Sequence, residues 1–568
     1  MIRRKKWFWF GRSLNQEIDP DNVLLDSSNI PEYDVTQFEG RLEKPIKRGM
    51  LFSILAFFFV VALVFIVQAV NLQIIHGSEY RDRSENNLLR NIPLFAGRGQ
   101  IKDRNNIVLA WNAPSVENSS NSAALRKYAT TSGMSHLLGY VKYPSKDKNG
   151  FYYEDDFVGE AGVEKQFDKT LQGISGVRLI EVDARNQIVS ESVARFPIQG
   201  KDLELSIDSR IQTVLYNNIS KIANEVGFSG GAGVIMDTRT GEIIAITSYP
   251  EFSSQMMSDK SDPEAIKSLL NDKSLPFLDR AIDGLYTPGS IMKPFIALGA
   301  LDQNIIGPND VIVTTGSISI PNPYDSTKST IFRDWKNHGA VDMRKAIAVS
   351  SDAYFYIVGG GYKDQKGLGI AKIDEYLKMF GFGTTTLDNK PSFFLNKSGT
   401  IPTPEWKKKT FNEDWFVGNT YHTSIGQYGF QVTLMQIVRA VASIANNGVI
   451  ISPTIIKDAS PSVESVVDIK KEYFDIVKEG MRLSVTEGTA LSLNIAGTEI
   501  AAKSGTAELG TSKEKINSWM TGFWPYNNPR YAFAVMMEKG TAHYLIGAGA
   551  VMRQTIEWMK ENTPEYFR

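Results

Sequence analysis

The longest uninterrupted apolar segment of the chain runs from Met50 to Val67 and contains neither a charged residue nor a proline. As a helix, these residues span roughly 27 Å, close to the hydrocarbon thickness of a bilayer. The segment is apolar on every face, whereas a helix at the surface of a soluble core has one apolar stripe. It is also longer than the apolar part of a cleaved signal peptide, and no small-x-small cleavage site follows it. The pattern therefore predicts one uncleaved membrane-spanning helix.

Basic residues stand on both sides of this segment, with more of them on the N-terminal side. Those before it include Arg3, Arg4, Lys5, Lys6, Arg41, Lys44, Lys47 and Arg48, and those soon after it are Arg81, Arg83 and Arg90. The positive-inside rule then favours a cytoplasmic N-terminus, although the difference is moderate.

The stretch up to about residue 225 alternates short strand patterns with turn residues. It contains two distinctive runs, residues 98–104 and 159–173, and neither holds a nucleophile beside a base. We interpret this part as a structural or docking module, a pedestal. The predicted boundaries are 1–48 for a cytoplasmic tail, 49–72 for the anchor, 73–225 for the pedestal and 226–568 for a catalytic domain.

The hydrophobic pattern changes from about residue 231. Residues 231–250 read as two apolar strands joined by a Thr-Gly turn, and residues 519–539 as a second hairpin across Asn-Asn-Pro. Helical periodicity lies between them, for example over 343–357 and 431–446. Strands at both ends with helices between predict an α+β domain in which helices cover an antiparallel sheet. The order of the strands does not follow from the pattern.

Charge and cysteine content exclude several classes of protein. The 62 basic and 63 acidic residues nearly cancel, so the basic field that drives nucleic-acid binding is missing. The chain has no cysteine, which excludes disulfides, thiol nucleophiles and cysteine-ligated zinc.

A candidate nucleophile stands in Thr287-Pro-Gly-Ser290-Ile-Met-Lys293. Pro-Gly is a turn signal, and the apolar residues that follow predict a helix beginning at or near Ser290. Residues i and i+3 share a helix face, so the Ser290 hydroxyl and the Lys293 ammonium project together. Serine needs an adjacent base, and lysine can serve if burial and nearby positive charge lower its pKa. Alone, Ser-x-x-Lys recurs by chance.

Two further motifs lie downstream. In Ser350-Ser351-Asp352, a hydroxyl beside a carboxyl group can relay a proton and orient the lysine, although such a sequence is more often a helix cap. Lys503-Ser504-Gly505-Thr506 enters the second hairpin. Its lysine and hydroxyls suit an anionic peptide terminus and its glycine permits close backbone approach, although alone it is compatible with an ordinary loop.

The order of the three motifs is more specific than any one of them. Ser-x-x-Lys, then Ser-x-Asp/Asn roughly 60 residues on, then Lys-Ser/Thr-Gly roughly 150 further, is typical of penicillin-binding proteins and serine β-lactamases. The five histidines suggest no competing triad, because no Gly-x-Ser-x-Gly motif accompanies them.

On these motifs the chain resembles a class B penicillin-binding protein over nearly its whole length, with residues 98–104 similar to the pedestal signature of that class. Within the class it looks most like the elongation-specific penicillin-binding protein 2 branch. That likeness is carried by residues 279–281, 333–336, 405–408 and 501–507 and by the acid at Asp352, where division-specific relatives usually have asparagine. The expected fold is a penicillin-binding transpeptidase domain on a mostly β pedestal, with one N-terminal transmembrane helix.

The resemblance implies a mechanism. Ser290 attacks the carbonyl between the last two D-alanines of a peptidoglycan stem peptide, Lys293 takes the serine proton and Ser350 relays it, with Asp352 near enough to tune the pair. Lys503, Ser504 and Thr506 hold the substrate carboxylate beside Gly505, and the backbone N–H groups of Ser290 and Thr506 form an oxyanion hole. β-Lactams would acylate the same serine.

The resemblance also implies a location and partners. The chain is expected in the bacterial cytoplasmic (inner) membrane as a single-pass protein with its catalytic domain periplasmic. The partners implied are a polytopic SEDS-family glycan polymerase and other proteins of the elongation complex.

Two positions depart from the family pattern. Some elongation-type members carry zinc near the middle motif, held by aspartates, a histidine and a cysteine. Asp334 and His338 match part of that set, but Ser351 stands in place of the cysteine, so we expect no metal and no cofactor. In addition, Tyr428 occupies a position that is usually glycine, which leaves the shape of that loop open.

Three alternative functions remain. A β-lactamase or β-lactam sensor shares the motifs, but the pedestal and the anchor argue against both. A scaffold that has lost its activity is disfavoured because all three motifs are intact. The third alternative is a division-specific class B transpeptidase.

Overall fold

The computed structural model describes residues 48–81, 89–113, 125–145, 156–182, 188–322, 325–384, 394, 397–510, 512–542 and 546–568. They fall into two compact units, one ending at Leu88 and the other spanning Leu89–Arg568. The expected cytoplasmic tail lies outside the described residues except for Arg48.

The first unit contains the helix α1 (Arg48–Val70), which continues into a π-helical turn over Asn71–Ile75. None of the residues of α1 is buried. Its 23 residues span about 34 Å, enough to cross the ~30 Å hydrocarbon core of a bilayer. Among the described residues it is the one helix long and apolar enough to do so, as the sequence predicted.

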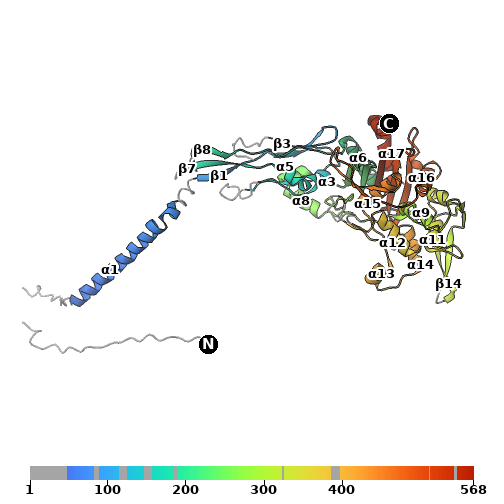
Figure 1. Ribbon diagram of the computed structural model, residues 1–568, viewed down its shortest axis with the longest axis horizontal. Coiled ribbons are helices and arrows are strands. Elements are labelled where there is room, and N and C mark those ends of the chain that lie inside the picture. Colours follow the sequence, from blue (N-terminus) through green and yellow to red (C-terminus); the bar gives the residue numbers. More distant parts are fainter. Residues whose placement is uncertain are drawn as a thin grey trace, which may run out of the picture. The chain divides into compact units, whose positions relative to one another are not determined.

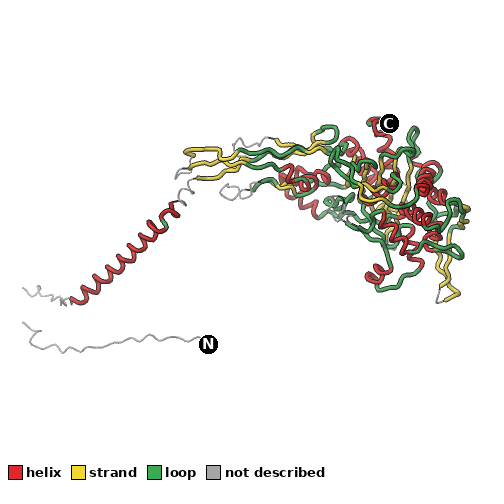
Figure 2. Tube along the Cα trace, in the orientation of Figure 1, coloured by secondary structure: helices red, strands yellow, loops and turns green. Residues whose placement is uncertain are grey.

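The N-terminal part of the second unit is mostly strand and loop, drawn in yellow and green in Figure 2. Its strands form a three-stranded antiparallel sheet in the order β1-β7-β8, a four-stranded sheet in the order β4-β3-β2-β9 and the pair β5-β6. The bounds are β1 Leu89–Leu94, β2 Ile101–Lys102, β3 Val108–Ala113, β4 Leu125–Tyr128, β5 Val141–Lys142, β6 Val158–Gly159, β7 Gly176–Val182, β8 Ile188–Arg195 and β9 Leu203–Glu204. Short helices lie among them: α3 Ser135–Leu138, α4 Gly162–Gln166 and α5 Asp168–Leu171.

A buried ion cluster explains the two distinctive runs of the pedestal. Glu164 accepts from the Nε atoms of Arg98 and Arg126, at 2.6 and 2.7 Å, and all three side chains are almost fully buried. Arg98 also donates to Asp168 at 2.7 Å. The runs 98–104 and 159–173 are thus two halves of one interior contact.

The C-terminal part is built on a five-stranded antiparallel sheet in the order β11-β10-β20-β19-β18. Both hairpins predicted from the sequence are present, and β18 lies at one edge. The bounds are β10 Gly230–Asp237, β11 Ile243–Tyr249, β18 Ala501–Leu509, β19 Lys515–Trp524 and β20 Tyr531–Thr541.

Helices cover both faces of this sheet (Figure 1), because alternate strand residues point to opposite sides. Val234 and Met236 join a core with α15 and α9, whereas Ile235 joins a core with α6 and α17. The α+β prediction is confirmed. The helices are α6 Ser209–Val226, α7 Ser254–Asp259, α8 Pro263–Leu270, α9 Lys293–Asp302, α10 Met343–Val349, α11 Asp352–Gly360, α12 Ile370–Met379, α13 Pro404–Phe411, α14 Val417–Ser424, α15 Leu434–Ala445, α16 Lys471–Thr486 and α17 Ala548–Asn562.

Short strand pairs complete the part with the larger sheet. They are β12 (Ile312–Thr314) with β15 (Gly339–Val341), β13 (Ser317–Asn322) with β14 (Asp325–Arg333), and β16 (Val449–Ile451) with β17 (Val463–Val466). Of these, β14 matters for the site, since its C-terminal end borders the cleft described below.

The helical pattern over 343–357 is not one helix. The chain leaves α10 at Val349, Ser350 takes a left-handed conformation (φ +59°), and α11 begins at Asp352. A prediction from periodicity misses this break, because both helices bury apolar side chains and no glycine or proline marks the junction.

Candidate active site

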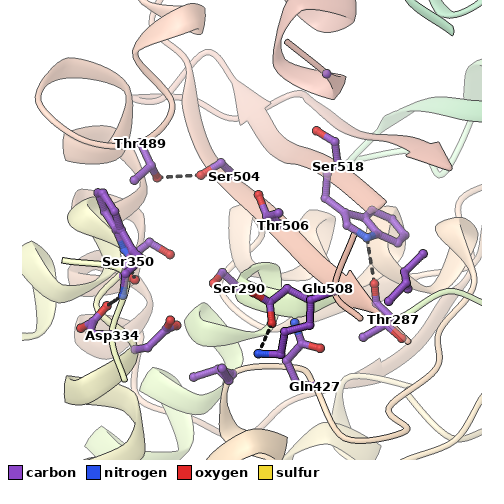
Figure 3. Close-up of a pocket in the computed structure, with 18 of the residues that line it drawn as sticks. Thr287, Ser290, Asp334, Ser350, Gln427, Thr489, Ser504, Thr506, Glu508 and Ser518 are labelled. Carbon is purple, nitrogen blue, oxygen red and sulfur yellow. Dashed lines mark hydrogen bonds and ion pairs between the residues drawn. The ribbon is translucent and has the colours of Figure 1, made fainter. Parts of the chain in front are cut away.

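The three motifs meet in one cleft with a volume of about 1450 Å³, at the edge of the sheet formed by β18. Ser290, Ser350, Asp352, Ser504, Gly505 and Thr506 line it. Figure 3 shows Ser290 between Ser350 and Thr506, with Ser504 above. Lys293 and Lys503 lie beneath this surface, and both are fully buried. The structure therefore brings together every candidate residue named from the sequence.

Ser290 lies in a 3-10 turn (Gly289–Met292) that leads directly into α9. Two glycines allow this turn to approach β18. A Cβ at Gly505 would lie 2.7 Å from Ile291 Cγ2, and one at Gly289 (φ +62°) would lie 2.8 Å from the carbonyl oxygen of Thr506. The glycine of the third motif thus permits the contact that sets the nucleophile against the strand.

Lys293 directs its three hydrogen bonds to the middle motif. Its Nζ donates to Asp352 Oδ1 at 2.6 Å, to the Ser350 carbonyl oxygen at 2.7 Å and to Ser350 Oγ at 3.2 Å. The Asp352 carboxylate is thus the acidic partner of a fully buried lysine side chain.

Lys503 approaches the same hydroxyl from the strand. Its Nζ donates to Ser350 Oγ at 2.8 Å and to the Ser504 carbonyl oxygen at 2.8 Å. Burial lowers the pKa of Lys503 well below its usual value, and the positive charge of Lys293 lowers it further, while Asp352 opposes both effects. A lysine with a lowered pKa can hold a neutral amine near neutral pH, and Ser350 Oγ connects it to Lys293.

The edge strand supplies the polar face of the cleft. Thr506 and Glu508 are exposed on β18 two residues apart and both line the cleft. The Ser504 hydroxyl donates to Thr489 Oγ1 at 2.6 Å. Because β18 is an edge strand of the sheet that the described residues form, an extended peptide can lie against it.

Several residues of the cleft were not singled out from the sequence as parts of the site. Thr489 holds Ser504, and the Trp335 indole Nε1 donates to the Ser350 carbonyl oxygen at 3.2 Å. His422 also lines the cleft, and burial together with the nearby Lys513 lowers the pKa of its imidazole. Trp335 stands in a run that already carried the family resemblance, whereas no local signal marks Thr489.

The residues beside the middle motif do not fit a zinc site. Asp334 Oδ2 accepts from Ser351 Oγ at 2.7 Å and from the Ala353 N–H at 2.9 Å, and His338 Nε2 stays 3.6 Å from Asp334 Oδ1. Ser351 is thus a hydrogen-bond donor where zinc would need a thiolate. A closed zinc site has about four ligands, and the described residues contain no group of three or more His, Asp or Glu side chains placed to hold a metal ion.

A loop at the rim of the cleft carries Tyr428 where the family resemblance leads one to expect glycine. Tyr428 has a φ of +62°, a conformation that favours glycine. Its ring is held edge-on by Trp406 and Trp415, at centroid distances of 6.1 and 5.8 Å. Two aromatic contacts therefore stabilise a strained residue at the rim of the cleft.

Comparison with known families agrees with this geometry. Residues 231–557, more than half of the chain, match the family described as the penicillin-binding protein transpeptidase domain. The chain belongs to the penicillin-binding protein transpeptidase family. Residues 119–205 match the penicillin-binding protein dimerisation domain, within the pedestal.

Within this family, the chain is similar to proteins named peptidoglycan D,D-transpeptidase MrdA. The chain is 32% identical to the peptidoglycan D,D-transpeptidase MrdA of Haemophilus influenzae over 451 residues, 73% of this chain and 66% of that protein. It is 28% identical to MrdA of Escherichia coli K12 over 599 residues, 87% of this chain and 91% of that protein.

Solved structures agree with these relatives. Penicillin-binding protein 2 of Pseudomonas aeruginosa, in complex with WCK 5153, superposes with a TM-score of 0.67 at 29% identity, covering 84% of this chain and 98% of that one. Penicillin-binding protein 2 of Helicobacter pylori, in complex with MreC, superposes with a TM-score of 0.68 at 26% identity, covering 83% of this chain and 99% of that one. The resemblance to class B, and to its penicillin-binding protein 2 branch, is confirmed.

Proposed function

We propose that this chain is a peptidoglycan D,D-transpeptidase of the elongation type, which cross-links stem peptides through an acyl-enzyme on Ser290. The observation that carries the proposal is the buried set of Lys293, Ser350 and Lys503, joined by hydrogen bonds beneath a cleft that Ser290 lines. The similarity to proteins named peptidoglycan D,D-transpeptidase supports it.

Acylation is the first step. Ser290 Oγ attacks the carbonyl carbon between the last two D-alanines as its proton passes to Lys293. The new C–O bond forms, the C–N bond breaks, and the terminal D-alanine leaves with a proton on its amine. Ser350 Oγ suits the relay of that proton, because it lies within hydrogen-bond distance of both buried lysines.

Residues of the edge strand β18 would bind and place the substrate. The N–H donors of Lys503 and the hydroxyls of Ser504 and Thr506 would hold the terminal carboxylate of the stem peptide. The backbone N–H groups of Ser290 and Thr506 would stabilise the oxyanion, each worth roughly 3 kcal/mol in the transition state.

Deacylation completes the reaction. An amine from a neighbouring stem peptide attacks the ester carbonyl, the C–N bond of a new amide forms, and the C–O bond to Ser290 breaks. The proton that the amine loses would pass through the relay to Ser290 Oγ. A β-lactam would acylate Ser290 in the same way, but its opened ring stays attached to the acyl group, so the adduct would persist.

The alternative functions are less well supported. A β-lactamase or sensor does not require the match to the dimerisation domain, and the relatives named above are MrdA proteins. Asp352 at the third position of the middle motif favours the elongation branch over the division branch.

We further propose the topology and the domain boundaries. Residues 1–48 are cytoplasmic, 49–72 span the membrane, and the pedestal (73–225) and the catalytic domain (226–568) lie outside, where the substrate is. The pedestal would contact a SEDS-family polymerase and elongation-complex proteins. The structure of the Helicobacter pylori relative in complex with MreC supports the proposal of protein partners other than the polymerase.

The test uses the full chain in detergent with a stem pentapeptide ending in D-Ala-D-Ala and an acceptor peptide with a free amine. We expect release of D-alanine together with a cross-linked product, and a penicillin adduct that lasts for minutes. Rapid turnover of penicillin without any cross-linked product would instead identify a β-lactamase.

A further inference from the structure

One buried carboxylate outside the three motifs contacts the middle motif on both sides of Asp352. Asp334 follows the last residue of β14, and its backbone N–H donates to the carbonyl oxygen of Gly316 at 2.9 Å. Its side chain is completely shielded from solvent. A buried charge of this kind is costly unless hydrogen bonds satisfy it, so its partners show what it holds.

Those partners are the first residues of α11. Asp334 Oδ2 accepts from Ser351 Oγ at 2.7 Å and from the Ala353 N–H at 2.9 Å, while Oδ1 accepts from the Trp335 N–H at 2.8 Å. Ser351 is also the N-cap of α11 and accepts from the Tyr354 N–H at 3.3 Å. A carboxylate at a helix N-terminus complements the free N–H groups there. The residues on either side of Asp352 are thus fixed to the end of β14.

The next residue of the same segment holds Ser350. The Trp335 indole Nε1 donates to the Ser350 carbonyl oxygen at 3.2 Å, the same oxygen that accepts from Lys293 at 2.7 Å. Ser350 is left-handed, a conformation that costs a residue with a side chain on the order of 1 kcal/mol and persists only where its surroundings enforce it. In Figure 3, Asp334 and Ser350 lie together on one side of the cleft.

We propose that Asp334 is a positioning residue for acylation. Together with Trp335, it holds Ser350 in the conformation that places its hydroxyl between Lys293 and Lys503, and it does so through hydrogen bonds without a metal ion. The proposal rests on the proposed function. Asp334 touches neither substrate nor nucleophile in this scheme, and it acts through Ser351, Ala353 and Trp335.

The experiment compares the second-order rate of acylation by a fluorescent penicillin in the full chain and its variants, together with the melting temperature and the pH–rate profile. Asp334→Asn keeps the size of the side chain but replaces one acceptor oxygen with an NH₂ group. That group would face the N–H or O–H donors that the carboxylate now binds. We expect acylation to slow by tenfold or more, with a displaced pH–rate profile, because Lys293 and Lys503 no longer share Ser350 in the same geometry. A purely structural loss would lower the melting temperature and leave the profile of the folded protein unchanged.

Matched variants keep the test informative if Asp334 variants fold poorly. Ser351→Thr retains the hydroxyl and should keep most of the acylation rate. Ser351→Ala removes the hydroxyl and should lose most of the acylation rate. Asp342 is the N-cap of α10, where its Oδ1 accepts from the Lys345 N–H at 2.9 Å, and Asp342→Ala removes this cap. It should lower the melting temperature without slowing acylation by the folded protein.

Two results would overturn the proposal. One is an Asp334→Asn variant that acylates at the wild-type rate with the wild-type pH profile. The other is a wild-type rate that disappears after dialysis against a chelator and returns with zinc. A folded wild type that is not acylated at all would instead contradict the proposed function. That result is distinct from the two results that contradict the positioning role of Asp334.

Discussion

Asp352 Oδ1 lies 2.6 Å from Lys293 Nζ and accepts a hydrogen bond from it, so the carboxylate contacts the residue that is proposed to take the serine proton. Lys503 lies on the other side of Ser350 Oγ, to which its Nζ donates at 2.8 Å. The geometry favours a role for Asp352 in orienting Lys293 by a hydrogen bond.

Substitution at Asp352 separates position from charge. Asn keeps the acceptor oxygen for Lys293 and loses the charge, whereas Ala loses both. If positioning dominates, Asp352→Asn keeps most of the acylation rate and Asp352→Ala loses tenfold or more, ~1.4 kcal/mol or above. The measurement is the acylation rate of both variants from pH 6 to pH 9. Equal slowing of the two across that range would contradict positioning.

Lys503 should reduce the stability of the folded chain. Its pKa is depressed by burial, so the unfolded chain binds more protons than the folded one between the folded and the unfolded pKa. Stability attributable to this residue therefore falls as pH drops through that window. We expect Lys503→Met to abolish acylation while its melting temperature equals or exceeds that of the wild type at pH 7, with the difference shrinking toward pH 10. A large loss of stability at pH 7 would contradict this account.

The sequence could specify the residues of the site but not what holds them. Ser290, Lys293, Ser350 and Lys503 follow from motif order, because the chemistry fixes the residue types at each position. The contact from Asp334 to Ser351 depends on where the end of β14 meets α11, which is a long-range packing result. Thr489, which receives the Ser504 hydroxyl, carries no local signal for the same reason.

At the scale of elements, the hairpins and the α+β class followed from hydrophobic alternation, whereas the break between α10 and α11 did not. Ser350 adopts its left-handed conformation without a glycine, so only tertiary contacts specify it. The strand order β11-β10-β20-β19-β18 likewise depends on pairing between segments far apart in the sequence.

The pedestal depends on one buried carboxylate between two arginines. Glu164→Ala leaves Arg98 and Arg126 without their shared partner, and breaking such a buried pair costs roughly 3–5 kcal/mol. Thermal unfolding of the full chain should show the loss. As a control, Glu191→Ala removes the exposed partner of Arg178 and should cost no more than about 1 kcal/mol. Equal effects of the two would refute the assigned role.

At the scale of the whole molecule, the uninterrupted apolar segment predicted one anchor, and the structure gives one unburied apolar helix among the described residues. Phe58→Arg places a charge near the middle of this helix, which costs ~2.5–3.5 kcal/mol on insertion scales. We expect impaired membrane insertion, measured by fractionation. Ile75→Arg, at the end of the span, should be tolerated because its charge can reach the interface. Equal insertion of both variants would contradict the assigned span.

The orientation of the chain is open to the same kind of test. Protease added to intact spheroplasts should digest the catalytic domain, because the substrate of the proposed reaction lies outside the membrane. Full protection of that domain would overturn the topology.

The most direct test of the central claim is to label the full chain with a tagged penicillin and to map the modified peptide. The account predicts one adduct, on Ser290, and no adduct in Ser290→Ala, whose melting temperature should stay nearly unchanged because only a hydroxyl at the cleft surface is lost. An adduct on another residue, or labelling that survives in Ser290→Ala, would contradict it.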